Sequence, residues 1–253
     1  MSRIVDPSID DPTITGRRER VLLEGEIAAI YPLLTYPPHP DLQRRMIPLE
    51  KDFGPIATRF LLLTLSRREE VAEARWGHID FKNGTWFKPN TKSKEAIRTQ
   101  TLPLSFAALE LLRSLPGSDQ DDPSAFVFPN RDGGKLGNWG RISKQVQEAS
   151  ETSGWTRHDL RRTGATLLKE LMIPLHVIDE ILDHKNPLSS SDTSNALINY
   201  FVSMPILTMR ENPIVTALNI LHEAFEAVVF EQSAVIPKVT PENFRFIRRA
   251  GEK

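Results

Sequence analysis

The sequence contains no cysteine among its 253 residues. This excludes disulfide bonds, thiolate catalysis and zinc sites built from cysteine. No apolar run reaches the roughly 18 residues that a membrane span requires, and the N-terminus lacks the apolar core of a signal peptide. We therefore expect a cytoplasmic protein without a membrane partner.

An excess of charge of either sign is also missing. Lys and Arg number 32 and Asp and Glu 33, which gives a formal net charge of -1. Nucleic-acid-binding domains tend to be basic, so this balance argues against such a partner. Local clusters nevertheless set the field at a binding face, and a neutral sum can hide them. A content of 40% hydrophobic and 26% charged residues is that of an ordinary globular protein.

The hydrophobic pattern predicts a mostly α fold with a small antiparallel β-sheet, an α+β class. Ser66 and Glu69 form a capping-box pattern that is expected to start a short helix. The tip of the second predicted hairpin, residues 90–97, is polar and rich in lysine. Helices are expected near residues 23–31, 55–64, 66–75, 106–115, 139–150, 156–171, 175–182, 195–202 and 213–230, and strands near residues 79–81, 85–88 and 99–104.

The stretch Trp155 to Thr166 organises the rest of the chain. Thr156 and Asp159 again form a capping box, so a helix should begin here. His158 and Arg161 are three residues apart and share one face of that helix. They lie close to its N-terminus, where free N–H groups and the helix dipole attract anions. A titratable imidazole beside a guanidinium suits a phosphate, although a capped helix with solvated charges explains the stretch equally well.

Other chemistry-bearing residues stand on both sides of this helix. Arg67 precedes it and has Glu70 one turn on, able to orient it. Lys92 lies in the polar hairpin tip, with Lys94 as a competitor, and His184 and Tyr200 follow. Each residue also has a structural alternative. Arg67 could form an ion pair on the helix surface, and Lys92 could be a solvated loop residue. His184 could cap a helix, and Tyr200 could lie in the core.

One phosphodiester chemistry uses all these residue types together. A tyrosine hydroxyl attacks phosphorus and forms a covalent intermediate. Two arginines hold the nonbridging oxygens, because guanidinium geometry fits phosphate and the group stays charged. A lysine or histidine donates a proton to the leaving oxygen. This chemistry needs neither a metal ion nor a cofactor.

The order Arg, Lys, His-x-x-Arg, His, Tyr resembles that of the tyrosine recombinases, the phage integrase family. The stretch Thr64 to Trp76 looks like the first arginine box of the family, and His158 to Thr166 looks like the second. The stretch Val177 to His184 resembles the segment that ends in the last histidine, and Thr101 to Ser105 resembles the strand after the lysine hairpin.

This resemblance implies a DNA-cleaving and rejoining enzyme that carries out site-specific recombination. It implies Tyr200 as the nucleophile, Arg67 and Arg161 as phosphate ligands, Lys92 as the general acid, and His158 and His184 as aids to proton transfer. The implied partner is double-stranded DNA in the cytoplasm, close to the nucleoid. A homotetramer would form in a synaptic complex, while an isolated chain could be monomeric.

The sequence departs from the family pattern at three places. The family usually has Gly-Leu before the first arginine, where this chain has Leu65-Ser66. The residue before the last histidine is usually Gly or Asn and is Asp183 here, an anion beside the expected phosphate site. The loop between His184 and Tyr200 is longer than in many members.

On this reading residues 1–20 are a linker or tail, residues 21–232 the recombinase catalytic domain, and residues 233–253 a basic tail. Family members usually carry a further N-terminal helical domain, so we expect the catalytic half of a DNA clamp that binds DNA weakly. Two other functions fit the pattern. One is a type IB topoisomerase activity, and the other is a catalytically silent, DNA-binding remnant of a mobile element.

Overall fold

The computed structural model describes residues 20–42, 47–92, 97–119, 122–183 and 212–230. The described part is mostly helical and has one small sheet, as the sequence predicts. Short 3-10 turns link several of the elements. The α-helices are α2 (Glu24–Ile30), α3 (Gly54–Thr64), α4 (Arg68–Ala72), α5 (Phe106–Ser114), α6 (Trp139–Ala149), α7 (Arg157–Glu170), α8 (Leu175–Ile181) and α10 (Pro213–Phe230), and the strands are β1 (Ile79–Asp80), β2 (Thr85–Lys92) and β3 (Ile97–Pro103).

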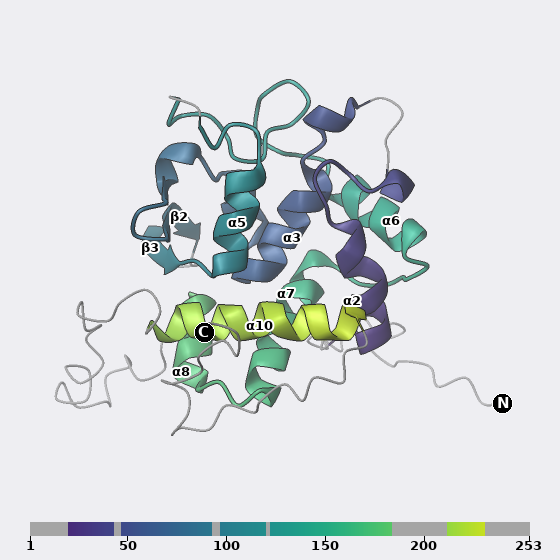
Figure 1. Cartoon of the computed structure of the whole chain (residues 1–253), viewed down its shortest axis with the longest axis vertical. Helices are drawn as coiled ribbons and strands as arrows, with labels where there is room; N and C mark the ends of the chain where they lie inside the picture. Colours follow the sequence, from purple (N-terminus) through teal and green to yellow (C-terminus); the bar gives the residue numbers. More distant parts are fainter. Residues whose placement is uncertain (1–19, 43–46, 93–96, 120–121, 184–211, 231–253) are drawn as a thin grey trace, which may run out of the picture.

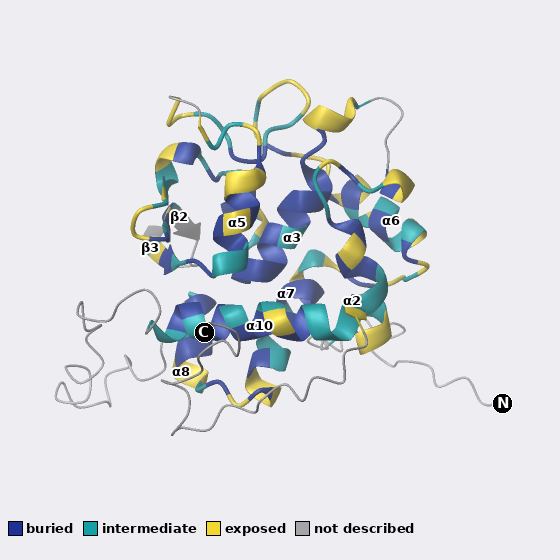
Figure 2. Ribbon diagram, viewed as in Figure 1, coloured by how far each residue is buried: buried dark blue, intermediate teal, exposed yellow. Residues whose placement is uncertain are grey.

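Helix α3 is the centre of the core (Figure 2). Its run Phe60 to Leu63 is at most 4% exposed, as its unbroken apolar sequence predicts. Such a helix is apolar all round because it packs on every side. It contacts α4, α5, α6, α7 and α10, and it ends where Leu65 takes a left-handed conformation with φ of 48°. That turn directs the chain into the first arginine box.

The sheet is antiparallel with the order β1-β2-β3. Strands β2 and β3 pair from Thr85↔Pro103 to Lys92↔Ile97, with a register irregularity between Lys88 and Thr91. The predicted strands were therefore too short, because the pairing continues past this irregularity. Lys92 is the last residue of β2 rather than part of the loop at the hairpin tip, which was the prediction.

Helix α7 begins where the capping box predicts. The Thr156 backbone N–H donates to Asp159 Oδ2 at 2.8 Å, and the Asp159 N–H donates to Thr156 Oγ1 at 3.3 Å. The buried Asp159 also pairs with Arg162 at 3.3 Å. This reciprocal cap satisfies donors that a helix start otherwise leaves free. The first turn of α7 is thereby fixed, and with it the direction of Arg161.

Helix α10 has the predicted bounds and crosses below α3 and α5 in the view of Figure 1. By length and composition it could cross a membrane, with a mean hydropathy of 1.3 over its 18 residues. The expectation that no apolar run reaches this length was therefore wrong. Its packing against α2, α3, α5, α7 and α8 accounts for its apolar character, and its buried residues include Leu218, Leu221 and Phe225.

Candidate active site

Arg67 stands at the entrance to the short helix α4. It is the N-cap residue, and its backbone N–H donates to Glu70 Oε2 at 3.0 Å. The predicted cap of Ser66 with Glu69 was wrong by one residue. The physical reason is that Ser66 is buried and its hydroxyl accepts a hydrogen bond from Lys88 instead. Glu70, three residues after Arg67, therefore takes the place of the capping carboxylate.

The guanidinium of Arg67 lies between α4 and the end of α8. Its Nη1 pairs with Glu70 Oε1 at 2.8 Å, which confirms that Glu70 orients it. The same nitrogen lies 3.5 Å from Asp183 Oδ2. Its Nη2 donates to the carbonyl oxygens of Leu182 and Asp183, each at 3.4 Å. The side chain keeps 35% of its surface exposed, so an anion from solvent can reach it.

Arg161 reaches the same place from α7. It is 5% exposed, and its Nη2 donates to the Leu182 carbonyl at 2.5 Å while its Nη1 donates to the Leu65 carbonyl. Burial and the charge of Arg67 lower the pKa of Arg161 to about 10. Its charge is still retained at neutral pH. The two arginines therefore converge on one carbonyl oxygen, that of Leu182, from two separate helices.

Two carboxylates and a second buried cation complete the cluster. Glu70 has a side chain only 5% exposed. Burial alone would raise the pKa of Glu70, but Lys88 and Arg67 together hold it below its usual value. Within the described residues, three cations thus face Glu70 and Asp183. The surplus positive charge suits a phosphate, which two guanidinium groups bind bidentately.

Lys88 is the site residue that sequence reasoning missed. It lies in the middle of β2, its side chain is 2% exposed, and its Nζ lies 3.2 Å from Glu70 Oε2. The signal was present in the alternation of β2, since Trp86 and Lys88 share one face of the strand. A lysine at a core-facing position is unusual enough to indicate a specific partner.

The structure places only part of the predicted site. Arg67 and Arg161 lie together, and His158 is an exposed residue in the first turn of α7. Lys92 closes β2, and its side chain lies outside the description. His184 and Tyr200 lie outside the described residues. Within the described part, no group of three His, Asp or Glu side chains could hold a metal ion.

Asp183 has a backbone conformation that suits the residue usually found there. Its φ is 48°, in the left-handed region that Gly and Asn enter most readily. These are also the residues that the resemblance leads one to expect at this position. The turn therefore suits Gly or Asn, whereas Asp183 adds a carboxylate beside Arg67.

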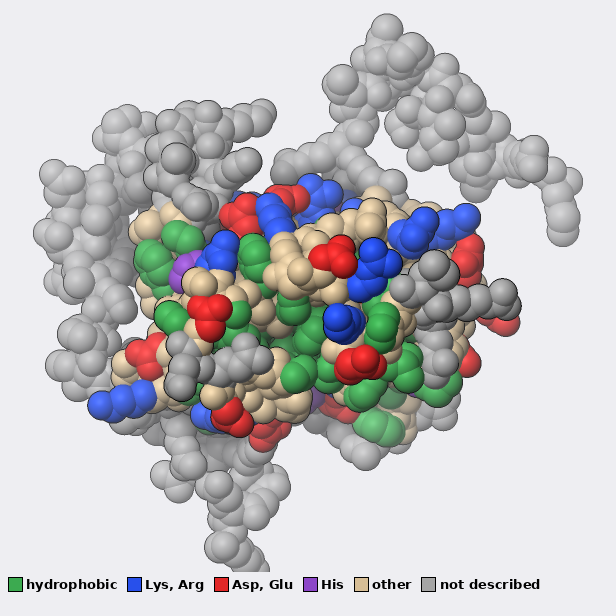
Figure 3. All heavy atoms as spheres, turned by 90° about the horizontal axis from the view of Figure 1, so that it is seen from above, with side chains coloured by type: hydrophobic (Ala, Val, Ile, Leu, Met, Phe, Trp, Pro, Cys, Tyr) green, Lys and Arg blue, Asp and Glu red, His purple; other side chains and the backbone are tan. Residues whose placement is uncertain are grey.

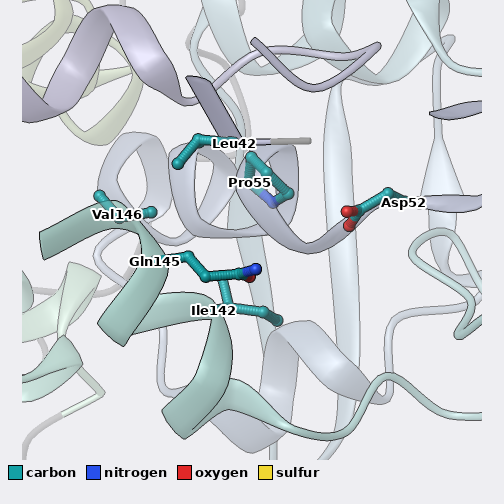
Figure 4. Close-up of a pocket in the computed structure, with 6 residues that line it drawn as sticks. All are labelled: Leu42, Asp52, Pro55, Ile142, Gln145 and Val146. Carbon is teal, nitrogen blue, oxygen red and sulfur yellow. The ribbon is translucent and has the colours of Figure 1, made fainter. Parts of the chain in front are cut away.

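A hollow of the described surface at the start of α3 is not part of this site. Figure 4 shows the side chains that line it, and its volume is about 180 Å³. The arginines lie beyond the other end of α3, which is about 16 Å long at 1.5 Å per residue. The face in Figure 3 likewise mixes basic and acidic side chains rather than gathering one sign. The hollow is lined by Leu42, Asp52, Pro55, Ile142, Gln145 and Val146.

A pair of converging arginines on such a helical scaffold defines an anion site suited to phosphate. Residues 45–191 match the phage integrase family, and the chain belongs to that family, the tyrosine recombinases. It is 35% identical over 130 residues to prophage integrase IntA and 33% identical over 139 residues to prophage integrase IntF, both of Escherichia coli K12. The two matches cover 49% and 52% of this chain.

The chain spans 29% of the length of each of these two relatives. Among solved structures, the integrase of mycobacterium phage Brujita matches 81% of this chain and 59% of its own at 19% identity, with a TM-score of 0.47. The family assignment rests on the sequence match.

Proposed function

We propose that this chain cleaves and rejoins DNA in site-specific recombination, as integration or excision, through a covalent 3′-phosphotyrosine. The convergence of Arg67 and Arg161 on the Leu182 carbonyl carries the proposal. Two guanidinium groups held this close repel each other, and a phosphate placed against both relieves that repulsion. Membership of the phage integrase family supports the same reaction.

In the proposed cleavage step, Tyr200 Oη attacks the scissile phosphorus. The new phosphorus–oxygen bond to Tyr200 forms as the bond to the 5′ oxygen breaks. Arg67 and Arg161 hold the nonbridging oxygens and stabilise the charge of the pentavalent transition state. Lys92 donates a proton to the leaving 5′ oxygen, and one of the two histidines, His158 or His184, accepts the proton that Tyr200 loses.

Rejoining reverses these roles. A 5′ hydroxyl of the partner strand attacks the phosphotyrosine, and Tyr200 leaves with a proton. The energy of the phosphodiester bond is conserved, so the reaction needs no nucleotide cofactor and no metal ion. The partner is double-stranded DNA in the cytoplasm, at the nucleoid. Exchange between two sites requires four protomers in a synaptic complex.

One observation favours a second candidate, a DNA-binding protein that has lost cleavage. The Asp183 carboxylate lies 3.5 Å from Arg67 Nη1, where a phosphate oxygen would have to compete with it. A silent DNA-binding remnant would bind DNA and form no covalent product. The experiment that separates the two candidates is therefore a test for covalent attachment.

That test uses a pool of nicked duplexes with a randomised core, because the recognised sequence is unknown. A nick just beyond the scissile phosphate lets the short fragment that carries the leaving 5′ hydroxyl diffuse away, which traps the covalent product. The full chain is incubated with the pool in EDTA, and SDS-resistant adducts are recovered and sequenced. We expect wild-type adducts that share a sequence and are absent with Tyr200→Phe.

Three results would overturn the proposal. DNA binding without any adduct would favour the silent DNA-binding protein. Adducts from Tyr200→Phe at the wild-type level would show that another residue is the nucleophile. Relaxation of supercoiled plasmid without sequence preference would instead indicate a topoisomerase of type IB.

A further inference from the structure

Lys88 occupies a place where the fold calls for an apolar side chain. In β2 the exposure alternates, with Trp86 and Lys88 buried and Phe87 exposed. The Lys88 Nζ lies 4.7 Å from the centre of the Trp86 ring. A buried ammonium costs several kcal/mol of lost hydration unless it is paired and hydrogen-bonded. Its partners should therefore explain why it is there.

The partners of Lys88 match the three donors of an ammonium group. Its Nζ lies 2.9 Å from Ser66 Oγ, 3.2 Å from Glu70 Oε2 and 2.9 Å from Gln100 Oε1. An ammonium has three N–H donors and no acceptor, whereas the neutral amine has two donors. The set of partners is thus complete for the charged form. Ser66 itself stands where the family usually has leucine, so the serine and the lysine form a polar pair at what is otherwise an apolar position.

Through Glu70, this ammonium is connected to Arg67. Glu70 Oε2 accepts from Lys88 and from the Arg67 backbone N–H, while Oε1 accepts from Arg67 Nη1 at 2.8 Å. Without Lys88, the buried carboxylate would lose one of its two cationic partners. It would then take up a proton or move, and the guanidinium that it holds would move with it.

Through Gln100, the same ammonium is connected to the other side of the site. Gln100 Nε2 donates to the Glu180 carbonyl at 2.7 Å. Glu180 belongs to α8. Just after this helix, the Leu182 carbonyl accepts from both arginines and the Asp183 carbonyl accepts from Arg67. Lys88 is therefore the common point of three segments: the first arginine box, the lysine hairpin and the end of α8.

We propose that Lys88 is a positioning residue of the recombination site, which holds Glu70 and Gln100 so that Arg67 meets the scissile phosphate in the correct orientation. The proposal rests on the function proposed above. Lys88 does not itself touch DNA, because its side chain is only 2% exposed and is paired with the buried Glu70. It is therefore a different lysine, with a different task, from Lys92 at the end of β2.

The charge of Lys88 is sensitive to pH. Burial lowers the pKa of Lys88 to about 8, although the Glu70 carboxylate opposes the shift. The other charged groups that face it are Arg161 from α7, which lowers the pKa further, and Asp183 after α8, which raises it. Below about pH 8, Lys88 is charged and donates to all three acceptors. Above that pH, the neutral amine interacts less strongly with the Glu70 carboxylate.

The test compares Lys88→Met with Lys82→Met, which removes an exposed lysine from the turn after β1. Single-turnover adduct formation is measured on a nicked duplex selected from the randomised pool, and DNA affinity is measured separately. We expect Lys88→Met to slow adduct formation about tenfold or more and to change affinity less, since positioning acts on the chemical step. Lys82→Met should match the wild type.

A double-mutant cycle with Glu70→Gln then asks whether Lys88 acts through Glu70. If it does, Lys88→Met should cost far less in the Glu70→Gln background, with a coupling of about tenfold in rate. A purely structural role predicts independent effects that follow thermal stability. Lys88→Arg keeps the charge and should recover part of the rate.

A readout without cleavage keeps the inference testable on its own. In chain labelled with ¹⁵N-arginine, the Nε–H signal of Arg67 is assigned by its loss in Arg67→Lys. We expect it to shift or broaden in Lys88→Met and to stay in place in Lys82→Met. An unchanged signal together with an additive cycle would overturn the role of Lys88. A wild type that forms no adduct, with a signal that still responds to Lys88→Met, would overturn only the proposed function.

Discussion

At the scale of single residues, Asp183 and Arg67 set the strength of the phosphate site. The Asp183 carboxylate lies 3.5 Å from Arg67 Nη1, so an incoming phosphate must displace it or accept its repulsion. Half-exposed ion pairs of this kind are weak, about 0.2 to 1 kcal/mol. If the site binds the scissile phosphate as proposed, a contact of this size weakens phosphate binding without preventing it.

We predict that Asp183→Asn strengthens DNA binding and speeds adduct formation, each by about two- to fivefold, the effect of a weak ion pair. Asparagine removes the charge and tolerates the φ of 48° at this position. Adduct formation and affinity on the selected nicked duplex measure the change. Asp132→Asn, at an exposed turn residue, is the matched control. Slower adduct formation in Asp183→Asn would indicate that the carboxylate assists the reaction.

At the scale of elements, the packing of α7 against the turn after α3 holds Arg161. Gly164 lies in α7 beside the side chain of Leu65, and a Cβ at residue 164 would overlap Leu65 Cδ2. Leu65 is fully buried, with φ of 48°, and its carbonyl accepts from Arg161 Nη1. The close approach of helix and turn thus places one of the two arginine ligands.

We predict that Gly164→Ala lowers the free energy of unfolding by about 1 to 3 kcal/mol, the usual cost of overpacking, and also slows adduct formation by displacing Arg161. Urea denaturation and the adduct assay measure the two effects. Gly140→Ala in α6, where a Cβ meets nothing within 4 Å, should instead stabilise by up to about 1 kcal/mol.

Leu65→Gly provides the complementary test, because it removes the overlapping side chain and suits the left-handed φ. The losses in free energy of unfolding caused by Leu65→Gly and by Gly164→Ala should be strongly non-additive in the double variant. Additive losses would mean that the two residues do not share this contact.

Most elements of the fold could be predicted from the sequence, and so could both arginines of the site with Glu70 and Asp183 beside them, but not Lys88. Capping boxes and periodicity located α7 and α10, because both signals are local. The pairing of β2 past its irregularity, the cap at Arg67 and the burial of Lys88 depend on contacts between segments distant in sequence. From the sequence alone, Lys88 would be interpreted as a surface lysine. Only the fold brings Ser66, Glu70 and Gln100 around it.

At the scale of the whole molecule, Tyr31 connects the N-terminal part of the described chain to α10. It lies in the 3-10 turn that directly follows α2. Its ring packs 5.3 Å from that of Phe225 and its hydroxyl lies 3.0 Å from His222 Nδ1. The Arg59 guanidinium lies 4.1 Å from the ring centre. The first described helix is thereby joined to the last, which closes the core around α3.

We predict that this contact weakens at alkaline pH. Burial raises the pKa of Tyr31 from 10.0 to about 12. The unfolded chain therefore releases this proton first, and the stability that Tyr31 contributes is complete below about pH 10 and is lost as pH rises toward 12. The difference in unfolding free energy between wild type and Tyr31→Phe, measured in urea at several pH values, should change over this window. A constant difference would contradict the prediction.

In the proposed reaction, a phosphate lies between Arg67 and Arg161 and becomes joined covalently to Tyr200. Mass spectrometry of the trapped adduct tests this most directly. After digestion with nuclease and trypsin, the peptide from Asn186 to Arg210 should carry a deoxynucleotide joined through its 3′ phosphate to Tyr200. Arg161→Lys should abolish this peptide, because an ammonium does not reproduce the bidentate contact. A nucleotide on any other residue, or an equal yield from Arg161→Lys, would contradict the account.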